Sequence, residues 1–201
     1  MGLRWVKCSI LGLLMGLASV QSGAEETPEA KVLALANGLA SISSSTDAPE
    51  VLHGRLCQMI RTNMDIEGIG NTLLGAFRKN APTDSLEAFY AIIPQSVVQS
   101  FRSIYELKNF TTEIKRIFED EKSVDVHTVL QASIPYNVIF TLVPAESGGF
   151  LVRNATIEGL SMLLSRRSNV QHDLRRLRRA GSKDPVADLA VEMAEKSTPC
   201  P

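Results

Sequence analysis

The chain has 201 residues, with 21 basic and 22 acidic side chains, so its net charge at pH 7 is −1. This balance excludes the strongly basic composition of a nucleic-acid-binding domain and the acidic runs of an interaction tail. Hydrophobic residues make up 44% of the chain, which is enough for one core, and three cysteines are too few for a disulfide-built scaffold.

Residues 1–24 have the pattern of a cleavable secretory signal peptide. Arg4 and Lys7 provide a positive start, residues 10–20 are uncharged and mostly apolar, and Ser22-Gly-Ala24 offers the small residues that a signal peptidase requires. A membrane anchor is the alternative, but the apolar run is about half of the ~20 residues that span a bilayer. We therefore expect a secreted protein.

Cleavage would leave a single domain over residues 25–196 and a loose tail over 197–201. This length suits one domain that buries about 70% of its surface. The two cysteines in this part of the chain are Cys57 and Cys200. A bridge between them is possible in an oxidising compartment. We expect them to be unpaired, because Cys57 fits a helix interior and Cys200 lies in the tail.

Apolar residues at helical spacing predict two N-terminal helices, over residues 29–43 and 49–63. Small polar residues separate them. Asp65 is a candidate N-cap for a third helix, in which Phe77 is expected to face inward.

The longest helical pattern runs from about residue 84 to residue 108. Its apolar residues recur every three or four positions: Leu86, Phe89, Ile93, Val97, Phe101 and Tyr105. Pro94 lies inside this pattern, where a proline removes one backbone hydrogen bond and clashes with the preceding turn. We expect a kink near residues 90–94, with two shorter helices as the alternative.

From about Phe110 the apolar period changes to two, which is typical of β-strands. The predicted strands cover residues 111–118, 124–133, 135–143 and 150–157. The last strand turns at residues 157–161 into an arginine-rich helix that ends at Gly181, and Asp184 with Pro185 begins a final helix. Helices followed by an antiparallel sheet predict an α+β fold.

No motif for catalysis, a metal or a cofactor is evident. The three histidines, His53, His127 and His172, lack a second ligand at metal spacing, and each fits a surface or edge position better than a catalytic one. The chain has no nucleophile elbow, no phosphate-binding loop and no dinucleotide fingerprint. We therefore expect a non-enzymatic protein without a metal or a cofactor.

An arginine cluster marks the helix that follows the last strand. Its members are Arg166, Arg167, Arg175, Arg176, Arg178 and Arg179. They can form a solvated helix face whose side chains cover apolar surface. They can also dock lipid phosphates or an acidic partner, since the planar guanidinium binds phosphate through two hydrogen bonds.

Two segments resemble the MlaC family, the periplasmic phospholipid-binding subunits of the Mla transport system, together with related toluene-tolerance and hopanoid-associated proteins. The first is residues 63–75, N-M-D-I-E-G-I-G-N-T-L-L-G, which precedes the long helix. The second is residues 157–162, I-E-G-L-S-M, which is similar to the family's V-x-E-G-V-S segment. The resemblance spans roughly residues 30–190.

The chain departs from the family pattern at several positions. Phe150 stands where the family usually has tryptophan, Asn154 where it often has aspartate, and Pro94 interrupts the long helix. The chain therefore resembles a divergent member.

The resemblance implies N-terminal helices packed on a curved, mainly antiparallel four-stranded sheet, NTF2-like in outline, with an apolar cavity and C-terminal helices. It implies a periplasmic carrier that holds phospholipid as cargo. The expected partners are an inner-membrane ABC transporter complex with its MCE-type subunit and an outer-membrane lipoprotein complex. A hopanoid-associated carrier, an adaptor with a filled core and an NTF2-like enzyme are the alternatives.

We expect apolar residues of the long helix, the third strand and the strand-to-helix junction to form the cavity wall. These candidates are Ile93, Val97, Phe101, Tyr105, Val138, Phe140, Leu142, Leu160 and Met162. Each can also be ordinary core. The candidates for contact with the headgroup or a partner are Arg166, Arg167, Arg175 and Arg176.

Overall fold

The computed structural model describes residues 26–100 and 110–201. The expected signal peptide lies outside these ranges, as do the predicted wall residues Phe101 and Tyr105. In chain order the elements are α1 (Pro28–Ser43), α2 (Pro49–Asn63), α3 (Ile66–Leu74), the 3₁₀ helix η1 (Gly75–Asn80), α4 (Thr83–Ser100), β1 (Thr111–Glu119), β2 (Val124–Gln131), β3 (Tyr136–Pro144), β4 (Phe150–Ile157), β5 (Leu160–Ser161), α6 (Met162–Arg179) and α7 (Pro185–Glu195).

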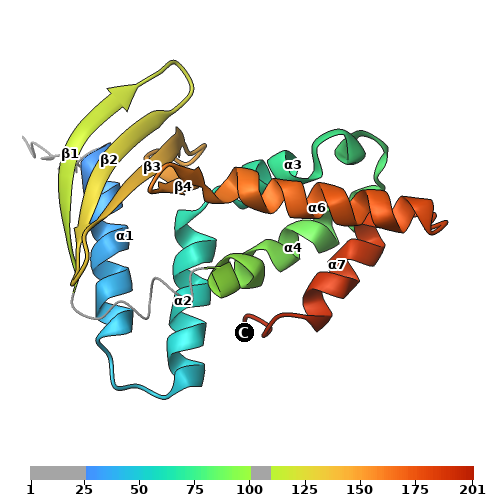
Figure 1. Ribbon diagram of the computed structural model, residues 1–201, viewed down its shortest axis with the longest axis horizontal. Helices are drawn as coiled ribbons and strands as arrows, with labels where there is room; N and C mark the ends of the chain where they lie inside the picture. Colours follow the sequence, from blue (N-terminus) through green and yellow to red (C-terminus); the bar gives the residue numbers. More distant parts are fainter. Residues whose placement is uncertain (1–25, 101–109) are drawn as a thin grey trace, which may run out of the picture.

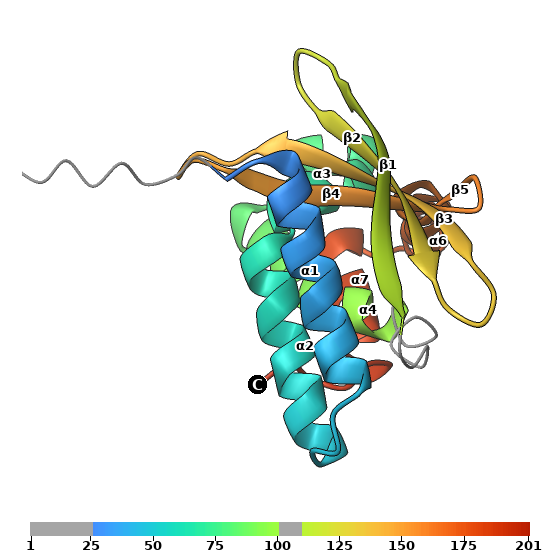
Figure 2. The same cartoon turned by 90° about the vertical axis from the view of Figure 1, so that its left-hand side faces the viewer.

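These elements form the predicted α+β fold. The sheet lies at one end of the molecule, and α6 extends away from it beside α4 and α7 (Figure 1). The paired helices α1 and α2 run along one side, with α1 against the sheet (Figure 2). None of the helices within the described ranges combines the length and the apolar run that a membrane span requires.

Helix starts follow local side-chain chemistry. Thr27, Asp65, Ser161 and Asp184 each accept a hydrogen bond from a backbone N–H in the first turn of the helix that follows. A cap of this kind pairs one of the N–H groups that have no partner inside the helix. The predicted caps Asp65 and Asp184 are confirmed.

Helix α4 is continuous across Pro94. The alternative of two shorter helices divided at this proline is therefore wrong. The kink near residues 90–94 stays a prediction. The third predicted helix is shorter than expected, because Gly75 adopts a φ of 52° and the chain continues as η1. Phe77 consequently lies in η1, packed against the core with the Arg178 guanidinium 5.2 Å from its ring centre.

The sheet has five strands in the order β1-β2-β3-β4-β5, one more than the sequence predicts. All neighbours are antiparallel. The added strand β5 is two residues long and follows a tight turn in which Glu158 and Gly159 both have positive φ. Two positive φ values suit a two-residue hairpin, and glycine adopts one of them without steric cost.

One face of the sheet supplies the core. Val126 and Thr128 of β2 alternate with less buried neighbours, as do Val138 and Phe140 of β3. Helix α1 contacts β1 and β2, whereas α2, α3 and α6 contact β4. Edge strand β1 carries a bulge between Ile114 and Arg116 and is mostly exposed. The period of two in the sequence therefore corresponds to alternating burial along β2 and β3, as expected.

The C-terminal tail is fixed to α2, which corrects two expectations. Cys57 and Cys200 form a disulfide, with their Cα atoms 5.6 Å apart. Arg61 also donates hydrogen bonds to the carbonyls of Cys200 and Pro201, at 3.3 and 2.5 Å. Helices α2 and α7 both pack against α4, so they lie close enough for the segment after α7 to end against α2. The tail is thus not loose, and the cysteines are not free.

Candidate functional site

Several hollows surround the C-terminal half of α4. We name the two larger ones the large hollow, of about 750 Å³, and the polar groove, of about 220 Å³. Two small apolar spaces are the inner cavity, of about 70 Å³, and the sheet cavity, of about 10 Å³. Residues 95–99 of α4 border three of these spaces. Each helical residue turns by about 100° relative to the one before, so a single turn of α4 presents side chains to all three.

The inner cavity lies between α3, α4, β4 and α6. Its apolar wall includes the predicted residues Ile93, Val97 and Met162. Ala155 borders both this cavity and the sheet cavity, where the predicted residues Val138 and Phe140 lie. The sheet cavity is close to the smallest space that admits one water molecule. The structure therefore brings these five side chains to two apolar spaces that share Ala155 of β4 in their walls.

Two predicted wall residues border none of the hollows found in the described ranges. Leu142 is fully buried in the core. Leu160 is 61% exposed, because it belongs to β5 rather than to the first turn of α6. Helix α6 begins at Met162, with Ser161 as its N-cap, so Leu160 lies outside the helix. Leu160 is therefore corrected to a surface residue of the β4–β5 turn.

Asn154 holds the junction between β4 and α6. Its side-chain oxygen accepts hydrogen bonds from Ser161 Oγ at 3.2 Å and from the backbone N–H of Leu163 at 3.1 Å. Its amide nitrogen donates to Thr156 Oγ1 at 3.2 Å. The amide oxygen of Asn154 thus accepts from one O–H and one N–H donor at the start of α6. This fixes where α6 leaves the sheet and therefore where Met162 enters the inner cavity.

Of the four arginines predicted to contact a headgroup or a partner, Arg166 borders two of the hollows. It borders both the inner cavity and the polar groove, and its Nη2 donates to Ser96 Oγ at 2.7 Å. Its Nε is buried without a hydrogen-bond partner. Burial lowers the pKa of the Arg166 guanidinium, and the charge of Asp173 opposes this shift. A cation therefore lies where an apolar space meets a polar one.

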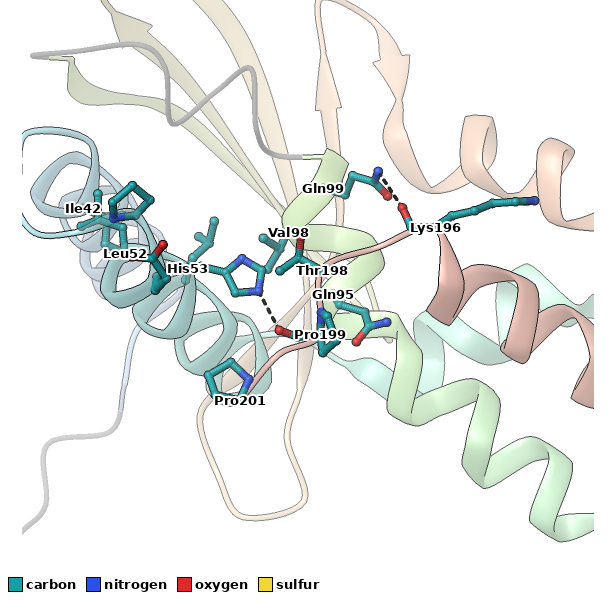
Figure 3. Close-up of a pocket in the computed structure, with 13 residues that line it drawn as sticks. Ile42, Leu52, His53, Gln95, Val98, Gln99, Lys196, Thr198, Pro199 and Pro201 are labelled. Atoms are coloured by element: carbon teal, nitrogen blue, oxygen red, sulfur yellow. Dashed lines mark hydrogen bonds between the residues drawn. The ribbon is translucent and has the colours of Figure 1, made fainter.

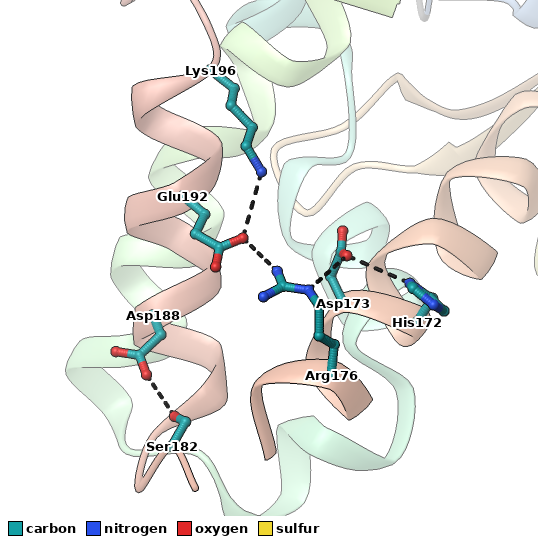
Figure 4. A network of polar contacts seen from close by, with 7 residues as sticks. All are labelled: His172, Asp173, Arg176, Ser182, Asp188, Glu192 and Lys196. Carbon is teal, nitrogen blue, oxygen red and sulfur yellow. Dashed lines mark hydrogen bonds and ion pairs between the residues drawn. The ribbon is translucent and has the colours of Figure 1, made fainter. Parts of the chain in front are cut away.

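The other predicted arginines have different surroundings. Arg167 and Arg175 are exposed and border none of the hollows that the structure describes. Arg176 Nη2 lies 2.6 Å from Glu192 Oε2, and its Nε lies 3.5 Å from Asp173 Oδ1 (Figure 4). The hydrogen bond from Arg176 lowers the pKa of Glu192. Arg176 thus joins α6 to α7.

The large hollow is not predicted from the sequence. Its apolar lining includes Ile42 of α1, Leu52 and Leu56 of α2, and Val98 of α4 (Figure 3). Polar side chains at its margin include Gln99, which donates to the Lys196 carbonyl at 3.4 Å. Three helices and the C-terminal segment meet here. Helical spacing in α4 does not show that the C-terminal segment lies opposite Val98.

A histidine lies beside the disulfide at the large hollow. His53 Nε2 is 3.5 Å from Cys57 Sγ and 3.0 Å from the Pro199 carbonyl oxygen. The ligand atoms of His53, Cys57 and Cys200 lie within 4.8 Å of one another. Because the two sulfurs are bonded to each other, this arrangement is a disulfide with a neighbouring imidazole and not a thiolate metal site.

Comparison with known proteins gives a family and a fold. A family model described as MlaC protein matches residues 34–188. A solved structure of a phospholipid-binding protein from Ralstonia solanacearum, in complex with a phospholipid, superposes with a TM-score of 0.67 at 15% sequence identity. The match covers 83% of this chain and 96% of that one. Comparison with curated proteins gave no significant match.

Proposed function

The chain belongs to the MlaC family, and we propose that it is a periplasmic carrier that binds a phospholipid and shuttles it between membrane transport complexes. The observation that carries this proposal is the arrangement around α4. Apolar spaces lie on two sides of the helix, and Arg166 stands where the inner cavity meets the polar groove. The Ralstonia solanacearum protein of the same fold, solved with a phospholipid, supports the choice of ligand.

The hydrophobic effect explains why such a carrier needs apolar spaces. Each acyl methylene exposed to water costs about 0.8 kcal/mol, so two tails cost on the order of 20 kcal/mol. The large hollow, at about 750 Å³, lies within the size range of ligand pockets. We assign the tails to the large hollow and to an inner cavity that widens as they enter. Ile93, Val97 and Met162 contact them there.

The headgroup is assigned to the polar groove. Arg166 borders the polar groove, and its guanidinium can donate hydrogen bonds to a phosphate there. The groove also contains Asn169 and Gln99, which can bind neutral or charged headgroup atoms. A headgroup in this position remains next to water while the tails are shielded.

We assign partner contact to the exposed face of α6. Arg167 and Arg175 are exposed there, and their charges can steer the protein toward an acidic surface of the inner-membrane ABC transporter complex or of the outer-membrane lipoprotein complex. We also assign residues 1–24 to a signal peptide that is removed on export. No reaction is needed for release, because a partner that competes for the tails can empty the site.

Lipid extraction tests the proposal. Protein purified from the periplasm without detergent is extracted with organic solvent, and the extract is analysed by mass spectrometry. We expect one phospholipid per protein. A stoichiometric hopanoid would favour the hopanoid-associated alternative. Protein without stoichiometric lipid would contradict the carrier function and favour an adaptor.

Two neighbouring substitutions provide a matched control. Met162→Asp places a charge in the wall of the inner cavity and should abolish lipid retention. It should still fold, because an acidic residue in the first turn of a helix is favourable. Leu160→Asp adds the same charge at an exposed position and should leave retention unchanged. Equal retention by both variants would contradict the assignment of the inner cavity.

The partner face is tested separately. Arg167→Glu with Arg175→Glu should leave the lipid bound, because neither side chain borders a hollow in the described structure. Transfer to the purified transporter complex should be slower. Unchanged transfer would move the partner contact to another face.

A further inference from the structure

The last six residues form a strap across the large hollow. We call residues 196–201 the C-terminal strap. It leaves α7 at Lys196 and ends against α2, where Pro201 lies close to Gly54. Thr198 and Pro199 border the hollow together with both ends of the strap (Figure 3). One wall of the hollow is therefore a chain segment without regular secondary structure.

Five hydrogen bonds among the described residues join the strap to α2 and α4, and four of them are exposed. At its start, Gln95 Nε2 donates to Ser197 Oγ at 2.8 Å. At its end, Arg61 donates to two strap carbonyls, and these hydrogen bonds are exposed. Thr198 and Pro199, between these points, are exposed and bury little apolar surface. Each of these hydrogen bonds can exchange with water, whereas the disulfide holds the strap to α2 covalently.

The two cysteines of that disulfide differ in exposure. Cys57 is 1% exposed in the middle of α2, whereas Cys200 is only partly buried at the end of the strap. We therefore infer that a thiolate from solvent attacks Cys200 rather than Cys57. Attack at Cys200 expels Cys57 as the thiolate, since exchange breaks the bond to the sulfur that is not attacked.

His53 is placed to act in both states of the strap. A carbonyl oxygen can only accept, so the 3.0 Å contact with Pro199 requires a proton on His53 Nε2. The same nitrogen lies 3.5 Å from Cys57 Sγ. When the strap leaves, this N–H loses the Pro199 carbonyl and can donate to the Cys57 thiolate instead. His53 therefore hydrogen-bonds the strap when it is closed and the leaving sulfur when it opens.

We propose that the C-terminal strap is a redox-controlled latch on the lipid site: a dithiol reductant opens it by cleaving the Cys57–Cys200 disulfide, and the bound lipid then leaves faster. One thiolate of the reductant attacks Cys200 Sγ, and Cys57 leaves as a thiolate. The second thiol of the reductant then displaces Cys200 and completes the transfer of two electrons. This proposal rests on the assignment of a lipid tail to the large hollow.

A transfer assay tests the latch. Mature protein loaded with a pyrene-labelled phosphatidylglycerol is mixed with unlabelled phosphatidylcholine vesicles, and the loss of label from the protein is followed. Reduction with a water-soluble phosphine should accelerate the loss by about tenfold, the factor expected when one or two strap hydrogen bonds open with the disulfide. Circular dichroism of the same samples shows whether the reduced protein stays folded.

The double variant Cys57→Ser with Cys200→Ser is the matched control. It should lose lipid at the rate of the reduced protein and should not respond to the phosphine. If this variant does not fold, His53→Ala, which keeps the disulfide, should give an intermediate rate before reduction. Equal rates for folded oxidised and reduced protein would overturn the latch. Failure of the oxidised protein to bind any labelled lipid would instead overturn the carrier function.

Discussion

Asp65 provides a sharp test of how the helices are attached to the sheet. Its Oδ1 accepts a hydrogen bond from the Gly68 N–H at 3.0 Å, which caps α3. Its Oδ2 accepts from Arg153 Nε of β4 at 2.6 Å and is ion-paired with Nη2 of the same side chain. One carboxylate thus joins the start of α3 to β4, the strand that borders the inner cavity. Asp65→Ala removes both functions.

The expected loss follows from these two contributions. An N-cap is worth about 1 kcal/mol. Hydrogen bonds to a charged group contribute about 1.5–3 kcal/mol, and the lower end applies because the Arg153 side chain is 41% exposed and water can solvate it. We expect Asp65→Ala to reduce the free energy of unfolding by about 2–3 kcal/mol. Asp65→Asn keeps a good cap and should lose only about 1 kcal/mol.

Urea unfolding of the mature protein, followed by circular dichroism, measures both losses. The two midpoints should be lowered without a change in the slope m, because the surface exposed on unfolding is the same. A loss below about 0.5 kcal/mol for Asp65→Ala, the usual range of an unimportant surface change, would refute the reasoning. Equal losses for the two variants would show that the cap contributes nothing.

Three further substitutions test other contacts by the same unfolding measurement. Gly70→Ala would place a Cβ 2.5 Å from the ring of Tyr90, and this overpacking should cost about 1–3 kcal/mol; an unchanged midpoint would contradict the close contact. Glu192→Gln should lower stability at pH 7. Arg176 holds the pKa of Glu192 below its ordinary value of 4.5, so this stabilisation is present above pH 4.5 and is lost as the pH falls through the lowered pKa; the variant should therefore lose less stability on acidification than the native protein, and parallel pH profiles would contradict this. Leu160→Ser should change stability by less than about 0.5 kcal/mol, and a larger loss would return Leu160 to the core.

Features that depend on nearby residues could be predicted from the sequence. Asp65 and Asp184 are caps because their side chains reach N–H groups within three residues. The alternation of Val138 and Phe140 with less buried neighbours places them on the core face of β3 whatever the register. Arg166 was identified with the other arginines, but composition alone could not separate it from Arg175. The difference is set by packing against α4.

Features that depend on distant pairs could not be predicted. The pairing of Cys57 with Cys200 joins positions 143 residues apart, and local spacing carries no information on that distance. The surface position of Leu160 depends on two positive φ values at Glu158 and Gly159, which produce β5 and delay the start of α6. The large hollow required both the tail and the α1–α2 pair to be placed. Each of these features depends on the tertiary structure, which local sequence patterns do not specify.

The disulfide stabilises most of the fold, although one of its cysteines lies near the end of the chain. It closes a loop that includes α3, α4, the sheet, α6 and α7, and in the chain-entropy model a loop of this length stabilises the fold by up to about 5 kcal/mol. Because the disulfide contributes this much to stability, its reduction can open the latch without unfolding the protein only if the rest of the fold is stable without it. The core residues of α4, the sheet and α6 form one continuous cluster. The folded state of the reduced protein is therefore the condition on which redox control of lipid release depends.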